Sequence, residues 1–265
     1  SHGPIERGID MVDNRGVDYQ FTSVNILGIP NVADSLHAIR KLVFGQGLYT
    51  LAEVRDATAA NWAGREPMRQ RFLNQDKFGN DLDEVDALLV RVTDSLARIL
   101  ESMVNLRGHH FRPSLFHFQG HLNPSAIGAT PDGRRAEEYL AHGINPQVGR
   151  NTEGLIATAN SIAKIDQRKF QGGPMQIELQ PRFFDGKDGI GGYVRAFSEP
   201  CFAKGGIHIN LNIMDLNKLR DAMVHPENPE YQNIIVRVTG YASRFICLPP
   251  HYQQEFVERM KHEGF

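Results

Sequence analysis

Two histidines stand four residues apart in the segment SLFHFQGH, at His117 and His121, which is the spacing of two zinc ligands on one helix. Gly120 and the loop-rich composition around it argue against a helix, and no glutamate completes an H-E-x-x-H pattern. The segment therefore favours no metal site. The sequence also contains neither a G-x-S-x-G elbow nor serine, histidine and aspartate residues spaced to suggest a triad.

A single glycine points to other chemistry in the segment VRVTGYASRF, residues 236–245. β-Branched residues lead up to it and predict a buried strand, whereas Gly240 is of a residue type that weakens strands and marks turns. On this pattern alone, Gly240 is interpreted as a tight turn between the last strand and the C-terminal helix. A second glycine-rich stretch, DGKDGIGG at 185–192, matches neither phosphate-binding pattern and favours a flexible surface or lid loop.

The bulk composition excludes several classes of function. The chain has 265 residues, of which 41% are apolar and 23% charged, as in an ordinary globular protein with a large core. A net charge of −2 gives no footprint for nucleic acid or an anionic membrane, and no apolar run has the length of a membrane span. Two cysteines, Cys201 and Cys247, do not make a disulfide framework, and the first residues lack a signal-peptide pattern. We therefore expect a cytoplasmic protein.

Helical periodicity predicts the elements that position these segments. A capping box from Thr50 to Glu53 opens one helix, and Asp215 is the expected N-cap of another. Residues 107–150 are rich in glycine, proline, histidine and asparagine and indicate loops with short strands between them. The predicted helices cover residues 33–44, 50–62, 82–105, 154–165, 215–225 and a segment after Pro250.

The clearest strand is GIHINLNIM, at 206–214, where apolar and polar residues alternate without a break. Its polar face consists of His208, Asn210 and Asn212. In an antiparallel sandwich this face would be wet, whereas in an α/β barrel it would point inward to a substrate or a partner loop. The alternation leaves both arrangements open. Strands alternate with helices in the second half of the chain, which favours an α/β fold.

Longer stretches of the sequence resemble the C-terminal end of the glycyl radical enzymes, in that family's order. They are NVADSLHAIRKLVF, DKFGNDLDEVD, GATPDGRRAEEYLAHGINPQVGRNTEG, GGIHINLNIMDLNKLRDAMVHPE, IIVRVTGYASRF and QQEFVERMKHE. The resemblance implies the C-terminal half of a ten-stranded α/β barrel of glycyl radical enzyme type, ending in the glycyl radical domain. We expect residues 1–140 to form the helical and loop part of this half, and residues 141–265 its last strands and the radical domain.

The resemblance gives Gly240 a catalytic role. In the family, the glycine of this motif loses a hydrogen atom from Cα to a radical-SAM activating enzyme and then stores the radical. Such a radical spreads into both flanking amides only where the residue is able to flatten, and glycine has no Cβ to hinder this. Val238, Tyr241 and Phe245 are then interpreted as a shell that keeps oxygen away, with ordinary structural packing as the alternative. We expect no metal or organic cofactor on this chain beyond the glycyl radical.

The family's thiyl cysteine, in a Gly-Cys-x-Glu-type segment, has no match here, because Cys201 and Cys247 stand at other positions. The resemblance therefore implies a split radical lyase or synthase of decarboxylase, dehydratase or fumarate-adding type, in which an N-terminal partner chain supplies the cysteine. The alternatives are a spare-part protein for an oxygen-damaged pyruvate formate-lyase-like enzyme, a formate acetyltransferase-type enzyme, and a fragment. The extensive helices and strands favour the split enzyme.

The segment FRPSLFHFQGHLNPSAIG resembles part of the family's cavity lining, so Phe116, Phe118 and His121 are the candidate substrate-binding residues. Their rings would suit a substrate with an apolar body, but phenylalanine is equally common in a protein core. The expected partners are the cysteine-bearing chain, the activating enzyme and a small-molecule substrate, without nucleic acid or membrane.

Overall fold

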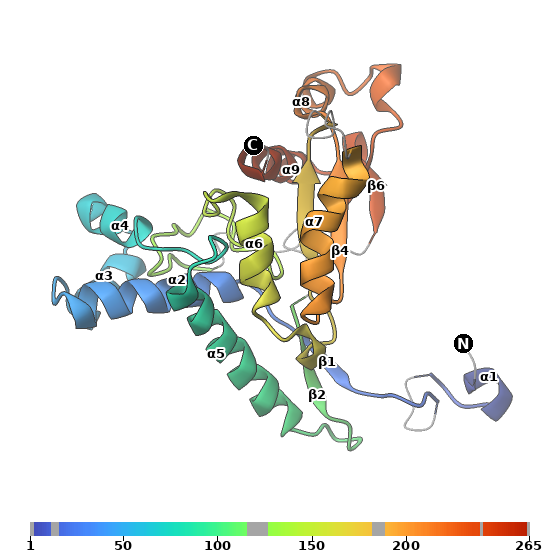
Figure 1. Cartoon of the computed structure of the whole chain (residues 1–265), viewed down its shortest axis with the longest axis horizontal. Coiled ribbons are helices and arrows are strands. Elements are labelled where there is room, and N and C mark those ends of the chain that lie inside the picture. Colours follow the sequence, from blue (N-terminus) through green and yellow to red (C-terminus); the bar gives the residue numbers. More distant parts are fainter. Residues whose placement is uncertain (1–2, 12–15, 116–126, 182–188, 239–240, 264–265) are drawn as a thin grey trace.

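The computed structural model describes residues 3–11, 16–115, 127–181, 189–238 and 241–263, along which helices and strands alternate (Figure 1). The helices are α1 (Pro4–Arg7), α2 (Ile29–Ile39), α3 (Leu51–Ala59), α4 (Glu66–Leu73), α5 (Asp83–Glu101), α6 (Gly154–Ala163), α7 (Gly189–Ala203), α8 (Leu216–Val224) and α9 (Pro250–Glu263). The strands are β1 (Thr22–Asn25), β2 (Phe111–Ser114), β3 (Met175–Leu179), β4 (Ile209–Ile213), β5 (Ile235–Arg237) and β6 (Ala242–Arg244). The predicted α/β class is confirmed.

The strands form three two-stranded sheets. β1 pairs with β2 and β3 pairs with β4 in parallel, whereas β5 and β6 are antiparallel. Helices connect the members of each parallel pair, α2 to α5 in the first and α7 in the second, as parallel strands require. Figure 1 shows α6 and α7 side by side, with β6 and the C-terminal helix α9 at the same end of the molecule.

The β3–β4 sheet has an apolar face and a polar face. Met175, Ile177 and Leu179 of β3 are buried members of the main hydrophobic cluster, and the partly buried Ile209, Leu211 and Ile213 of β4 pack against it. The register pairs Gln176 with Asn210 and Glu178 with Asn212, so these four polar side chains share the other face. Their exposed fractions are 2%, 5%, 0% and 5%. Water therefore does not solvate this polar face.

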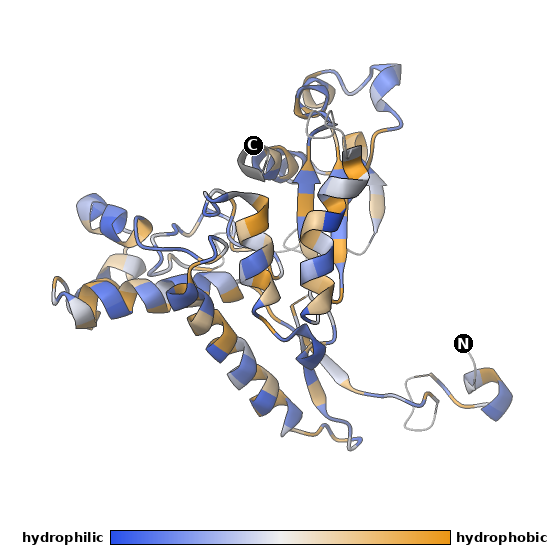
Figure 2. Ribbon diagram, viewed as in Figure 1, coloured by the Kyte–Doolittle hydropathy of each residue, from blue (hydrophilic) through white to orange (hydrophobic). Residues whose placement is uncertain are grey.

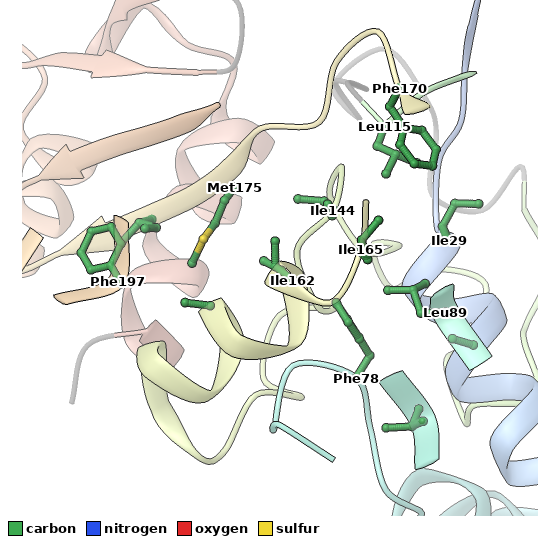
Figure 3. Close-up of a cluster of buried hydrophobic side chains, with 14 of the residues drawn as sticks. Ile29, Phe78, Leu89, Leu115, Ile144, Ile162, Ile165, Phe170, Met175 and Phe197 are labelled. Atoms are coloured by element: carbon green, nitrogen blue, oxygen red, sulfur yellow. The ribbon is translucent and has the colours of Figure 1, made fainter. Parts of the chain in front are cut away.

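The main cluster joins both halves of the chain. Figure 3 shows Phe78 and Leu89 facing Ile144 and Ile162, with Met175 and Phe197 at the other end of the same cluster. Figure 2 shows apolar and polar bands interleaved along α5, as expected of a helix with one buried stripe. The proposed division between residues 140 and 141 stays a prediction.

A second cluster packs against one face of the β5–β6 hairpin. Leu219 and Ala222 of α8 pack there with Val236 and Phe245, and α9, which contacts α8, completes the cluster. The α9 members are Tyr252, Phe256, Val257 and Met260. The last two helices thus cover one face of the hairpin.

Both predicted helix caps are confirmed. Thr50 Oγ1 accepts the backbone N–H of Glu53, whose carboxylate accepts the N–H of Thr50, so the capping box is complete. Asp215 caps α8 by accepting the N–H groups of Asn217 and Lys218. The predicted helix at 33–44 begins earlier, at Ile29, and continues into a π-helical segment, Arg40–Gly45.

The sequence interpretation was wrong for part of the glycine-rich stretch at 185–192. Residues 182–188 lie outside the described residues, but Gly189 begins α7 rather than a lid loop. This helix buries Phe197 and Cys201, and burial of that face outweighs the low helix propensity of its glycines. Among the described residues, no helix is both long and apolar enough to cross a membrane.

Candidate functional site

The segment around Gly240 lies at the connection of a hairpin. β5 and β6 are antiparallel, and Val238 donates its backbone N–H to Tyr241 O at 2.9 Å. The two residues between this pair, Thr239 and Gly240, lie outside the described residues. Two-residue hairpin connections favour glycine as a residue type. The last strand therefore returns through β6 before the chain reaches α9, instead of leading directly into the helix as the sequence pattern suggested.

Two of the three predicted shell residues are buried: Val238 directly precedes the connection, whereas Phe245 pairs with Ile234 at the opposite end of the hairpin. Val238 is 2% exposed and Phe245 is 0% exposed, and both pack in the cluster around the hairpin. Tyr241 is 47% exposed, so its ring is not part of that cluster. Apolar packing thus covers one face of the hairpin, on the side of α8 and α9.

The side chain of Asn212 joins the hairpin to the β3–β4 sheet. Asn212 Oδ1 accepts the backbone N–H of Arg237 at 2.8 Å, and Asn212 Nδ2 donates to Arg237 O at 3.0 Å. Arg237 is the last residue of β5 and stands three residues before Gly240. One buried amide therefore binds both backbone groups of a residue close to the connection.

Helix α9 holds the other end of the hairpin. Gln253 Nε2 donates to Phe245 O at 3.1 Å and to Leu248 O at 3.0 Å, and the side chain is buried. These two carbonyl groups belong to the turn that follows β6. The sequence pattern did not single out Gln253, because an isolated glutamine carries no signal of what it contacts.

A buried ionic group ties α9 to the polar face of β3. Arg259 Nη2 lies 3.4 Å from Glu178 Oε1, and both side chains are almost fully buried. Glu255, one turn earlier, lies with its Oε1 3.8 Å from His142 Nδ1. Burial raises the pKa of the Glu255 carboxyl, Arg259 opposes that rise, and the nearby Glu178 charge adds to it.

The burial of Asn210 and Asn212 decides between the two arrangements that the alternation left open. β4 pairs in parallel with β3, and both asparagines are 5% exposed, so the wet face of an antiparallel sandwich is excluded. His208 Nε2 and Asn210 Oδ1 are 2.8 Å apart along the same strand. The polar face points inward, and the hairpin is the partner that Asn212 binds.

The other predicted site residues are not described. Phe116, Phe118 and His121, and with them His117, fall within residues 116–126, outside the described residues. Their role in substrate binding stays a prediction. Both cysteines are free, Cys201 buried and Cys247 exposed, and burial raises the pKa of the Cys201 thiol.

Among the described residues, His37, Asp76 and Glu84 form one group with atoms close enough to hold a metal ion. The carboxylate of Glu84 is already occupied by two cations. Its Oε1 lies 2.6 Å from Arg40 Nη2 and its Oε2 lies 2.7 Å from Lys41 Nζ. A metal ion there would have to displace both ion pairs, so the group does not indicate a metal centre.

Comparison with known proteins matches two parts of the chain to protein-family models. Residues 1–123 match the family model described as pyruvate formate lyase-like, and residues 140–246 match the model described as glycine radical. The second match spans the hairpin and Gly240. The chain belongs to the glycyl radical enzyme family.

Solved structures and curated relatives agree with this assignment. The glycerol-bound B12-independent glycerol dehydratase from Clostridium butyricum superposes with a TM-score of 0.88 and 31% identity, covering 97% of this chain and 33% of the dehydratase. Indoleacetate decarboxylase from Tractidigestivibacter scatoligenes is 31% identical over 99% of this chain and 32% of its own length. Trans-4-hydroxy-L-proline dehydratase from Clostridioides difficile is 30% identical over 96% of this chain and 32% of its own length. The chain has the barrel-type fold of glycyl radical enzymes and spans about a third of the length of these relatives.

Proposed function

We propose that this chain is the radical-bearing part of a glycyl radical lyase or synthase, with the radical stored on Gly240. The observation that carries the proposal is the hairpin: its connection contains Gly240, its flanking strands are buried on one face, and it lies within the segment matched by the glycine radical model. The relatives named above are a decarboxylase and two dehydratases. These relatives favour a decarboxylase or a dehydratase as the reaction class, and a fumarate-adding synthase stays in the proposal on the sequence resemblance alone.

In the proposed chemistry, a radical-SAM activating enzyme removes one hydrogen atom from Cα of Gly240. The glycyl radical then takes a hydrogen atom from a cysteine thiol, which restores glycine and leaves a thiyl radical to attack the substrate. Neither Cys201 nor Cys247 stands in a Gly-Cys-x-Glu segment. We therefore propose that the cysteine belongs to a partner chain, and that the substrate pocket is shared with it. Residues of this chain position and shield the glycine.

The radical assignment is tested by anaerobic activation followed by electron paramagnetic resonance. We expect Gly240→Ala to abolish the signal, because a Cβ at this position hinders the planar radical. Gly191→Ala is the matched control, since a Cβ at Gly191 meets nothing within 4 Å and the residue lies in α7. A signal of unchanged hyperfine shape in Gly240→Ala would place the radical elsewhere.

The partner is tested by anaerobic purification from the native host, with mass spectrometry of every protein that comes with the chain. A stable partner that contains a Gly-Cys-x-Glu-type segment supports the split enzyme. Transient association with a full-length homologue supports the spare-part alternative instead. The predicted cytoplasmic location stays a prediction.

A further inference from the structure

The hydrogen-bond pattern of the hairpin leaves one edge of β5 facing away from β6. Val238 N donates to Tyr241 O, and Phe245 N donates to Ile234 O at 2.8 Å, so the even-numbered residues 234, 236 and 238 direct their backbone groups toward β6. Backbone groups of alternate residues point to opposite edges of a strand. The N–H and C=O groups of Arg237 therefore point away from β6.

Asn212 takes the place of a neighbouring strand along that edge. β4 and β5 belong to separate sheets, yet the Asn212 side chain pairs with both backbone groups of Arg237. The amide offers one donor and one acceptor, as a strand residue does, and it is 5% exposed. Because Asn212 is buried, breaking this pair would leave its side-chain amide without these two hydrogen-bond partners, which is costly.

The molecule uses the same device at a second place, away from the hairpin. Asn145 Oδ1 accepts the N–H of Gln176 at 2.7 Å, and Asn145 Nδ2 donates to Gln176 O at 2.7 Å. Asn145 is also 5% exposed. Asn145 binds β3, whereas Asn212 binds the strand that leads to Gly240. The two asparagines make the same hydrogen bonds and are equally buried, so Asn145 is a matched control for Asn212.

We propose that Asn212 is the positioning residue of the glycyl hairpin: its amide fixes Arg237 against β4 and thereby sets the position and shielding of Gly240. The inference rests on the proposed function, because it assigns a role in holding the radical. Arg237 is three residues from Gly240, and three residues of chain span at most about 10 Å. Loosening the two hydrogen bonds between Asn212 and Arg237, here called the clamp, therefore loosens the strand that leads directly to Gly240.

The clamp itself is tested in the unactivated full chain by hydrogen exchange with mass spectrometry. We expect Asn212→Ala to speed exchange in peptides covering residues 235–245 on the order of tenfold, because two hydrogen bonds to the backbone of one residue are lost. Peptides covering β3 should keep their rates. Asn145→Ala should do the reverse and speed exchange in β3 alone. Unchanged hairpin exchange in Asn212→Ala would overturn the proposal.

The positioning role is then tested on the activated protein by the decay of the radical signal under a fixed low oxygen pressure. Asn212→Ala should form a signal of the same hyperfine shape that decays several times faster than wild type, whereas Asn145→Ala should decay at the wild-type rate. Equal decay in both variants would reduce Asn212 to a purely structural residue. If the wild-type chain forms no radical, the proposed function fails, while the exchange experiment still reports on the clamp.

Asn212→Asp gives a readout that a general loss of stability would not produce. A neutral carboxylic acid keeps both a donor and an acceptor toward Arg237, whereas the carboxylate loses the donor and faces Arg237 O with a negative charge. The charged groups around this position are Glu178 on β3, Arg259 of α9 paired with it, and Arg237 on β5, while His208 lies four residues back on β4. At each pH, the exchange rate of the hairpin and the decay rate of the radical in Asn212→Asp are divided by the wild-type values. Both ratios should fall toward one as the pH is lowered and the aspartate becomes protonated.

This pH-dependent rescue also tests the positioning role of Asn212 if the Asn212→Ala protein does not fold. Rescue at low pH supports the clamp, because only the protonated side chain reproduces the amide's two hydrogen bonds. Absence of rescue in a folded Asn212→Asp protein would overturn it.

Discussion

At the residue scale, Glu255 shows how the support of the hairpin depends on a buried charge. The side chain is 7% exposed, and burial raises the pKa of its carboxyl despite the nearby Arg259. A carboxyl whose pKa is higher in the folded protein than in the unfolded chain destabilises the fold once it ionises. Its ionisation therefore lowers stability as the pH rises from about 4.3, the ordinary value for glutamate, through the raised folded value.

We expect Glu255→Gln to raise the free energy of unfolding at neutral pH and to flatten its decline with rising pH. Below about pH 4 the two proteins should converge, because the carboxyl is then protonated in both states. Denaturant unfolding at a series of pH values measures this. Glu258→Gln is the control, since Glu258 accepts a hydrogen bond from Gln254 on an exposed part of α9. A loss of stability at pH 7 in Glu255→Gln would show that its attraction to Arg259 outweighs burial.

At the element scale, helix α8 forms one wall of the hairpin cluster and begins at a single side-chain cap. Asp215 Oδ1 accepts the N–H of Asn217 at 2.8 Å and that of Lys218 at 3.3 Å. Asp215→Ala should cost about 1 kcal/mol in the free energy of unfolding, whereas Asp215→Asn should retain most of the stability because asparagine caps equally well. Equal losses in both variants would show that Asp215 acts through its charge. Denaturant unfolding separates the two outcomes.

The elements also show where sequence reasoning succeeds. The caps at Thr50 and Asp215 and the alternating strand β4 were predictable, because each depends on residues adjacent in sequence. β3 was missed although Met175, Ile177 and Leu179 alternate with Gln176 and Glu178, and that period was an available signal. Helix α7 was missed for a physical reason: its glycines disfavour a helix, and it is stabilised by distant contacts of Phe197.

The candidate site also contains features that the sequence predicts and contacts that it does not. Gly240 stood out because a local motif marks it, and the polar face of β4 stood out by its period. The sequence did not reveal that Asn212 binds Arg237, 25 residues further along the chain, or that Gln253 holds the turn after β6. Such contacts depend on how the sheet, the hairpin and α9 pack together, and no local pattern encodes that packing.

At the scale of the whole molecule, the hairpin and the C-terminal helix form one packed unit with the body of the chain. If Gly240 carries the proposed radical, cleavage of the chain there by oxygen leaves residues 241–265 without a covalent link to the rest. Within that piece, Phe245, Leu248 and Phe256 are buried against Leu219 and Val236 on the other side of the break. Each fully buried side chain of this size contributes about 1.5–3 kcal/mol, so the contacts outlast the loss of one peptide connection.

We therefore expect the activated protein, after exposure to air, to elute at its original size under native conditions and to separate into two pieces only after denaturation. Mass spectrometry of the smaller piece should place the break at Gly240, and Gly240→Ala treated in the same way should stay intact. Arg259→Met, which removes the ion pair with Glu178 across the break, should let the cleaved piece dissociate at lower denaturant than in wild type. Release of the piece without denaturant would show that covalent continuity, rather than packing, holds α9 in place. An uncleaved chain would instead count against the radical on Gly240.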